Sequence, residues 1–142
     1  MTTKEITTLK NYSSKFERLI DANINRLKEG LRVIEDICRY IHDDKILTPK
    51  IKSLRHKLQL AHNINRLEHR NINDDIQKIS TKSELIRNSL DDLIIANFSR
   101  TQESARVLEE FFKLSDIDLS ELFKNIRYDL YAIEKDYFNS YQ

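Results

Sequence analysis

Apolar residues in the first third of the chain recur three, four or seven positions apart. This spacing places them on one face of an α-helix, because a helix makes one turn in 3.6 residues. Ser14-Lys15-Phe16-Glu17 has the form of a capping box, in which serine and glutamate oxygens accept hydrogen bonds from the free amides of a helix start. We therefore expect a first helix from residue 14 to about residue 42, with a core face of Leu19, Ile20, Leu27, Leu31, Ile34, Cys38 and Ile41.

The same periodicity predicts three further helices. Thr48-Pro49 predicts an N-cap followed by proline in the first helical turn, and this second helix extends to about Arg70. A third helix is expected from a capping box, Thr81-Lys82-Ser83-Glu84, to about Leu114. A fourth is expected from Asp118-Leu119-Ser120-Glu121 to about Phe138. Between the second and third helices, residues 71–80 are predicted to form a loop held down by Ile72, Ile76 and Ile79.

The composition favours helices over strands. The 142 residues include one glycine and one proline, which are few turn formers for a β protein. Four helices with mostly short connections predict an all-α, up-down-up-down bundle built from a duplicated helical hairpin. No linker divides the chain, so residues 1–142 are expected to form a single helical domain, with a polar arm at 1–12 and pseudo-repeats at about 13–70 and 81–140.

Charge and hydropathy exclude several classes of function. The formal net charge is +1, so no basic surface for nucleic acid or for an anionic membrane is expected. No apolar run is long enough to span a bilayer, and the N-terminal residues lack the apolar core of a signal peptide. The single cysteine, Cys38, is expected to be a core residue and not a nucleophile. These features favour a cytoplasmic protein.

A segment of the first helix recurs in the third. The sequence from Asp21, DANINRLKEGLRVIED, returns from Ala96 as ANFSRTQESARVLEE, and a fixed offset of this kind indicates an internal duplication. Most retained positions are polar or charged, whereas a duplication that kept only a core would retain leucine and isoleucine. The bias indicates a site. The retained positions are Ala22, Asn23, Arg26, Glu29, Arg32, Val33 and Glu35, paired with Ala96, Asn97, Arg100, Glu103, Arg106, Val107 and Glu109.

A helical wheel places Asn23 and Gly30 within the apolar arc and Arg26 at its edge. A glycine inside a helix costs about 1 kcal/mol relative to alanine, so Gly30 indicates close approach of a neighbour or a ligand. If the first and third helices are parallel and diagonal, as in an up-down-up-down bundle, Arg26 and Arg100 face each other across the bundle axis. Two guanidinium groups beside a partly apolar interior need an anion or paired carboxylates, and arginine is well shaped to bind a phosphate. The sequence therefore predicts an anionic ligand, with Asn97, Arg100 and Ser104 repeating the first set.

The charged positions can also be explained as ion pairs. Glu29 is three residues from both Arg26 and Arg32, a favourable spacing on a helix surface. For Arg32, Glu35, Arg106 and Glu109, which point away from the arc, both explanations stay open, and Arg55 could pair with Glu35. If a nucleotide binds, Mg²⁺ needs only one or two carboxylates besides the phosphates. The candidates are Asp21, Glu29, Asp74, Asp75 and Glu103.

From Ile20 to Asp36, with the spacing NRxxEGLRVxED, the sequence resembles a small helical family of thiamin biosynthesis. Members of that family occur alone or fused ahead of thiamin-phosphate synthase. A second signature from Ala96 to Glu110 matches too, as does Arg127-Tyr128 with Tyr131 and Glu134, so the likeness covers about residues 16–138. One departure is the loop, where Arg70-Asn71 is followed by Asp74-Asp75-Ile76 without the family's glycine.

The resemblance implies a hydroxymethylpyrimidine phosphate kinase. Such an enzyme transfers the γ-phosphoryl group of ATP to 4-amino-5-hydroxymethyl-2-methylpyrimidine phosphate with the help of Mg²⁺, a reaction that needs mainly positioning and charge neutralisation. Under this hypothesis Asn23 and Asn97 orient the pyrimidine or its phosphate, Glu29 and Glu103 act at the catalytic centre as ligands of Mg²⁺, and Asp21 is the candidate for taking the hydroxymethyl proton. The phosphate-binding candidates are Arg26, Arg32, Arg55, Arg100, Arg106 and Arg127.

Two other functions stay open at this stage. A non-catalytic module that binds a pyrimidine phosphate and regulates or tethers the synthase would show ligand affinity without turnover. A purely structural bundle, with its charged repeat serving as an ion-pair ladder, would show no stabilisation by ligand. The expected partners are the small pyrimidine phosphate and, through a functional association, thiamin-phosphate synthase. A homodimer is left open, and no nucleic acid or membrane is expected.

Overall fold

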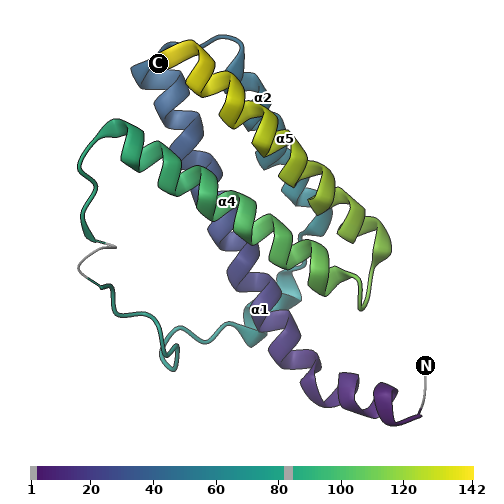
Figure 1. Cartoon of the computed structure of the whole chain (residues 1–142). Coiled ribbons are helices and arrows are strands. Elements are labelled where there is room, and N and C mark those ends of the chain that lie inside the picture. Colours follow the sequence, from purple (N-terminus) through teal and green to yellow (C-terminus); the bar gives the residue numbers. More distant parts are fainter. Residues whose placement is uncertain (1–2, 82–84) are drawn as a thin grey trace.

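The computed structural model describes residues 3–81 and 85–142, with side chains from residue 13 onward. Within these ranges it contains helices and connections but no strand, and the predicted all-α bundle is confirmed (Figure 1). The elements are α1 (Thr3–Asp36), the π-helical turn η1 (Ile37–Ile41), α2 (Leu47–Lys57), the 3₁₀ segments η2 (Leu58–Ala61) and η3 (Ile64–His69), α4 (Leu90–Phe112) and α5 (Ile117–Tyr141).

The first helix begins earlier than the sequence predicts. α1 is continuous from Thr3, so Ser14 and Glu17 lie inside the helix and the capping box predicted there is wrong. No glycine or proline interrupts residues 3–29, and polar residues by themselves do not stop a helix. The carboxylate of Glu17 has another use, because it accepts a hydrogen bond of 2.7 Å from Arg66 Nε.

The second predicted helix is divided. α2 ends at Lys57, and the chain is extended at Asn63, whose side chain caps η3. Buried Arg66 fixes this break, because it donates hydrogen bonds to the carbonyl oxygen of Ala61 and to Glu17 of α1. A continuous helix to Arg70 would lose these contacts, so tertiary bonding outweighs helix periodicity here.

The start of α2 also differs from the prediction. Asp44 Oδ1 accepts hydrogen bonds from the amides of Ile46 (2.9 Å) and Leu47 (2.7 Å). Asp44, and not Thr48, therefore satisfies the free amides of this helix end. The Thr48 hydroxyl is buried without a hydrogen-bond partner among the described residues.

The caps of α4 and α5 lie at other residues than expected. Ser89 caps α4 by accepting from the amide of Asp92 at 3.1 Å, and residues 86–88 are not helical. The expected start at residue 81 is therefore wrong, and residues 82–84 of the predicted capping box lie outside the described residues. Asp116, which accepts from Leu119 N at 3.1 Å, caps α5 in place of the box predicted at Asp118.

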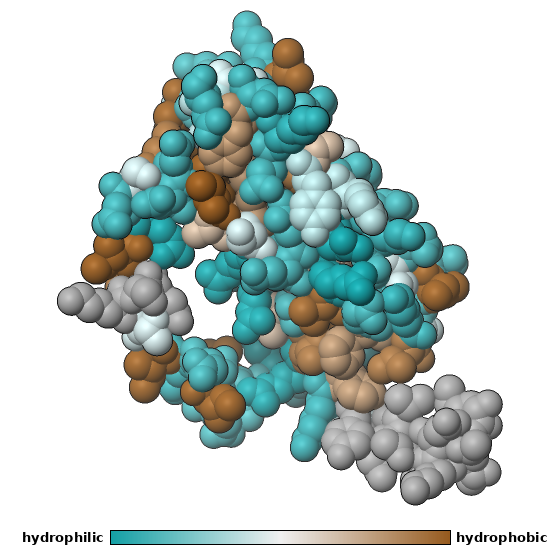
Figure 2. All heavy atoms as spheres, in the orientation of Figure 1, coloured by the Kyte–Doolittle hydropathy of each residue, from teal (hydrophilic) through white to brown (hydrophobic). Residues whose placement is uncertain are grey.

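Residues 71–80 form the predicted loop, but its isoleucines do not hold it down. Ile72, Ile76 and Ile79 are 68%, 94% and 83% exposed. Figure 2 shows apolar side chains along this loop and an opening between the loop and the body of the molecule. The loop is therefore attached mainly at its beginning, through polar contacts described below.

The directions of the helices differ from the expected arrangement. Phe16 of α1 lies against Phe111 of α4 (5.8 Å between ring centroids), whereas Gly30 lies against Thr101. Advancing along α1 therefore means moving back along α4, so these two helices are antiparallel neighbours (Figure 1). The expectation that the first and third helices are parallel and diagonal is wrong, because an apolar periodicity does not encode helix direction.

Two antiparallel hairpins build the bundle. α2 lies antiparallel to α1, and α5 lies antiparallel to α4 along a run of aromatic contacts that includes Phe112–Phe123 and Phe98–Tyr137. α1 and α5 consequently run one way, and α2 and α4 the other. Ion pairs of Lys50 with Asp136 and Lys57 with Asp129 join α2 to α5.

The core lies between the hairpins and includes most of the face that the sequence periodicity selected. Ile41 was expected there but is 57% exposed, because the π-helical turn η1 changes the helical register, and Leu19 is only partly buried. Leu27, Leu31 and Ile34 of α1 are fully buried, together with Cys38 in η1, which confirms the expected core role of the cysteine. Burial raises the pKa of the Cys38 thiol to about 12. None of the described helices is long and apolar enough to cross a membrane.

Candidate functional site

The repeated asparagines make the same local hydrogen bond in both hairpins. Asn23 Nδ2 donates to the carbonyl oxygen of Leu19, and Asn97 Nδ2 donates to that of Leu93, each at 2.9 Å. Each bond spans one helical turn and holds the amide plane in place. The side-chain carbonyl oxygen is the part of each residue that remains for a ligand.

Two buried carboxylates repeat in the same way. Glu35 Oε2 and Oε1 accept from Arg55 Nε at 3.0 Å and NH2 at 3.2 Å, and Glu109 Oε1 accepts from Arg127 Nε at 3.1 Å and NH2 at 2.9 Å. Each pair joins the two helices of one hairpin. The duplication therefore retained an interhelical clamp in addition to the residues of a site.

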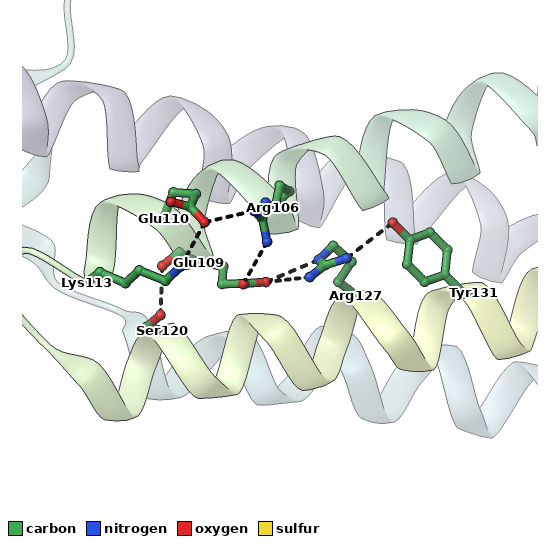
Figure 3. A network of polar contacts seen from close by, with 7 residues as sticks. All are labelled: Arg106, Glu109, Glu110, Lys113, Ser120, Arg127 and Tyr131. Atoms are coloured by element: carbon green, nitrogen blue, oxygen red, sulfur yellow. Dashed lines mark hydrogen bonds and ion pairs between the residues drawn. The ribbon is translucent and has the colours of Figure 1, made fainter.

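The second clamp is part of a larger network (Figure 3). Arg106 contacts Glu109 and Glu110, and the Arg127 guanidinium lies 3.5 Å from the Tyr131 hydroxyl. Hydrogen bonds to Tyr131 and Glu109 raise the pKa of Arg127. Arg32 makes the corresponding contact with Glu35 at 3.4 Å. Among the predicted phosphate-binding arginines, Arg32, Arg55, Arg106 and Arg127 are therefore ion-paired within the protein.

A large cavity lies beside the first copy of the repeat. It has a volume of about 850 Å³, within the range of about 300–1,000 Å³ that is usual for ligand pockets. α1 supplies Asn23, Arg26 and Glu29 to its wall, and Val107 and Phe111 of α4 give it an apolar side. Buried Asn23 and exposed Arg26 and Glu29 are thus brought together, as the first signature predicts.

The beginning of the 71–80 loop closes this cavity on one side. Asn71, Ile72 and Asp75 line it, and Arg18 NH2 donates to the carbonyl oxygen of Asn71 at 3.0 Å. Asp74, the neighbouring carboxylate, is hydrogen-bonded to Asn71 at 2.9 Å. The loop therefore brings Asp75 to the cavity, whereas Asp74 stabilises the turn beside it.

A bidentate ion pair fixes the position of that loop. Arg70 donates to Asp21 from Nε at 2.7 Å and from NH2 at 2.8 Å. The hydrogen bond to Asp21 raises the pKa of Arg70. Asp21, predicted as a catalytic base, is consequently engaged as the anchor of the loop.

The second copy of the repeat has different surroundings. Glu103 and Arg106 line a cavity of about 430 Å³ with Tyr131, and Arg100 is exposed and lines neither cavity. Glu29 and Glu103 therefore face different cavities. Arg26 and Arg100 do not flank the bundle axis as expected, because α1 and α4 are antiparallel and both guanidinium groups lie on the surface.

A metal site formed by protein ligands alone is absent from the described residues, which contain no group of three histidine, cysteine, aspartate or glutamate side chains suited to it. Mg²⁺ bound with phosphates requires only one or two carboxylates. Glu29 and Asp75 line the large cavity and fit that requirement.

Sequence reasoning did not select several residues of the large cavity, among them Arg18, Arg70 and Phe111. Arg18 and Arg70 bind the loop, and Phe111 forms part of the apolar side. Phe111 comes directly after the second signature in the sequence, and this position could have indicated that it belongs to the site. Arg70 and Asp21 are 49 positions apart, and nothing in the spacing pairs them.

Comparison with known proteins agrees with the signatures. The sequence model described as the ThiD2 family matches residues 18–136. The chain belongs to the ThiD2 family.

Similar proteins named thiamine-phosphate synthase occur in several bacteria. That of Thermosynechococcus vestitus is 39% identical over 122 residues (85% of this chain, 35% of the relative), and that of Prochlorococcus marinus subsp. pastoris is 35% identical over 126 residues (88% and 36%). That of Synechococcus sp. CC9311 is 42% identical over 118 residues (82% and 33%). The chain spans about a third of the length of these curated relatives. No solved structure matches it.

Proposed function

We propose that this chain acts in thiamin biosynthesis as a hydroxymethylpyrimidine phosphate kinase, with the large cavity beside the first repeat as its acceptor site. The observation that carries the proposal is that this cavity gathers Asn23, Arg26 and Glu29, the polar residues of the first family signature, beside the apolar Val107 and Phe111. A flat heterocycle with one phosphate needs this combination of an apolar surface, a hydrogen-bonding amide and a cation.

Arg26 is the best placed anchor for the phosphate of the acceptor. It lines the cavity and makes no ion pair with another described residue, whereas Arg55, Arg106 and Arg127 are held by buried carboxylates. A guanidinium can bind two phosphate oxygens at once. The pyrimidine ring would lie against Phe111, with the carbonyl oxygen of Asn23 accepting from its amino group.

The reaction needs no general base on the protein. The acceptor atom is an oxygen of the pyrimidine's phosphate, which is already ionised near neutral pH because its second pKa is about 6. This oxygen forms a bond to the γ-phosphorus of ATP while the bond from that phosphorus to the β,γ-bridging oxygen breaks, and ADP leaves. The role first considered for Asp21, taking a hydroxymethyl proton, is therefore unnecessary for this substrate, and its contact with Arg70 gives it a positioning role.

Magnesium fits the proposed site through Glu29 and Asp75. These two carboxylates would hold the ion together with phosphate oxygens, where it would neutralise charge that develops during transfer. The protein residues hold the acceptor and shield the cavity, with the Asp21–Arg70 pair fixing the start of the loop.

The relatives suggest where the product is used. They carry the segment that matches this chain within longer proteins named thiamine-phosphate synthase. We infer that a synthase consumes the diphosphate made here, either through association or by free diffusion.

ADP release tests the proposed activity. The protein is incubated with Mg-ATP and either the pyrimidine monophosphate or the unphosphorylated pyrimidine, and ADP is measured over time. The proposal predicts turnover that depends on the monophosphate. Thermal stabilisation by the monophosphate without ADP release would instead support the non-catalytic binding module. The absence of both effects would leave a structural bundle.

A further inference from the structure

A second cavity lies between α1 and the segment from α2 to η3. Its volume is about 310 Å³, at the lower end of the usual range of about 300–1,000 Å³ for ligand pockets. One carboxylate and six basic side chains line it. They are Asp21, Lys28, Arg55, His56, His62, Arg66 and Arg70. We call this space the basic cavity.

The three arginines of the basic cavity are already neutralised by carboxylates of α1. Arg55 pairs with Glu35 at 3.0 Å, Arg66 with Glu17 at 2.7 Å and Arg70 with Asp21 at 2.7 Å. Lys28, His56 and His62 make no ion pair or hydrogen bond with another described side chain. Lys28 therefore brings a positive charge to the cavity that no described carboxylate pairs with, and His56 and His62 add ring nitrogens that can hydrogen-bond to an anion.

The internal duplication provides a comparison that separates structure from function. Aligning the two hairpins places Lys28 at the position of Gln102, and His62 at that of Glu134. In the second hairpin Gln102 Nε2 donates to Glu134 Oε1 at 3.1 Å, so a neutral amide and an acid contact each other there. His56 corresponds to Tyr128. The hairpin therefore folds without basic groups at these positions, so their presence in the first copy points to a ligand.

The two cavities share a wall. Asp21, Asn25 and Arg70 line both of them. Direct phosphoryl transfer requires the donor and acceptor phosphates to lie close together, and the two cavities are adjacent, with the Asp21–Arg70 ion pair between them.

We propose that the basic cavity binds the phosphate chain of the nucleotide, with Lys28, His56 and His62 contacting its oxygens. The identification of the anion as a nucleotide rests on the proposed kinase function. The binding of a polyphosphate anion in the basic cavity does not depend on that function.

Histidine NMR tests this assignment without using activity. The chain has four histidines, of which His56 and His62 line the cavity, His69 lies outside it and His42 is hydrogen-bonded to Tyr137 at 2.8 Å. Titration with inorganic pyrophosphate, and separately with ADP, should move the ring signals of His56 and His62 while those of His42 and His69 stay in place.

A matched pair of lysine variants gives the second readout. Lys28→Gln introduces the residue that the second hairpin already carries, and it should weaken binding of pyrophosphate and ADP about tenfold, as expected for one lost hydrogen bond to a charged group. Lys52→Gln removes the same charge from an exposed position of α2 outside the cavity and should leave the affinity unchanged.

Three results would overturn the assignment. The first is no movement of the His56 and His62 signals, and the second is equal weakening by the two lysine variants, which would indicate unspecific attraction. The third is movement of these signals with the pyrimidine monophosphate and not with ADP. Failure of the kinase is recognised separately: pyrophosphate binding at His56 and His62 without ADP release would support the anion site and contradict the proposed activity.

Discussion

Arg70 holds Asp21 through two hydrogen bonds of 2.7 and 2.8 Å, although the two residues are 49 positions apart in the chain. The contact joins the end of η3 to the first repeated signature and forms the wall between the two cavities. The acid that the sequence marks as a candidate catalytic residue thus positions the loop that closes the site.

Replacing Asp21 with Asn should raise the KM for the pyrimidine monophosphate, whereas the melting temperature should fall only slightly. The pair is partly exposed, so its contribution to stability is expected to be about 1 kcal/mol or less. A double-mutant cycle with Arg70→Gln, measured by thermal unfolding and by KM, checks the coupling. Additive effects of the two substitutions on KM would show that the pair does not act as a unit.

Gly30 allows α4 to approach α1. A Cβ atom at Gly30 would lie 2.6 Å from Thr101 Cγ2, and Thr101 is fully buried. We expect Gly30→Ala to destabilise the protein by about 1–3 kcal/mol in urea unfolding, despite the better helix propensity of alanine.

The compensating variant is Gly30→Ala with Thr101→Ser. Serine lacks the clashing methyl group and retains the hydroxyl, which donates to the Phe98 carbonyl at 2.8 Å. In the Thr101→Ser background, adding Gly30→Ala should no longer lower the free energy of unfolding. If it does not, close packing at this position is not the reason for the glycine.

The buried clamp of the second hairpin should contribute strongly to stability. Glu109→Ala leaves the Arg127 guanidinium, which is only 12% exposed, without its carboxylate, and loss of one partner of a buried pair costs about 3–5 kcal/mol. Glu110→Ala, at the exposed neighbouring position, is the matched control and should leave the melting temperature nearly unchanged. Similar melting temperatures for the two variants would contradict a structural role for the clamp.

Stability should fall at alkaline pH. The Tyr141 hydroxyl donates to Asp44 Oδ2 at 2.5 Å, and this hydrogen bond raises the pKa of Tyr141 from 10.0 to about 12. Burial raises the pKa of Cys38 from 9.0 to about 12. Between the ordinary pKa values of 9.0 and 10.0 and the native values of about 12, the unfolded chain loses protons that the native protein retains. The stability that these two groups contribute is therefore fully present below about pH 9 and is lost as the pH rises to 12.

The variant Tyr141→Phe isolates the contribution of Tyr141 to that dependence. It should be less stable than the wild type at pH 8, and its free energy of unfolding should fall less steeply between pH 10 and 12. Tyr40→Phe, which changes an exposed tyrosine, serves as the control. If the free energy of unfolding of Tyr141→Phe falls with pH as steeply as that of the wild type, the Tyr141–Asp44 hydrogen bond does not cause the loss of stability.

The sequence predicts the helical faces and the duplicated positions well, because both are local. Leu27, Leu31 and Ile34 are buried as the periodicity requires, and Asn23 and Asn97 repeat one hydrogen bond. Gly30 is in close contact with a neighbour, as its place in the helix indicates.

The features that the sequence does not predict depend on contacts between distant residues. The break after α2 is held by Arg66 through Glu17 of α1, and Arg70 finds Asp21 across the same interface. The segment after η3 reaches the first copy of the repeat, so Arg26 lines the large cavity together with Asn71 and Asp75 while Arg100 does not. A helical wheel contains neither kind of information.

The most direct test of the central claim compares Arg26→Gln with Arg100→Gln in the ADP-release assay. These substitutions remove the same charge from duplicated positions, only one of which lines the large cavity. We predict that Arg26→Gln raises the KM for the pyrimidine monophosphate by about 10- to 100-fold, as expected for the loss of a charged hydrogen bond, whereas Arg100→Gln has a much smaller effect. Equal losses in the two variants, or a larger loss in Arg100→Gln, would contradict the placement of the acceptor site beside the first repeat.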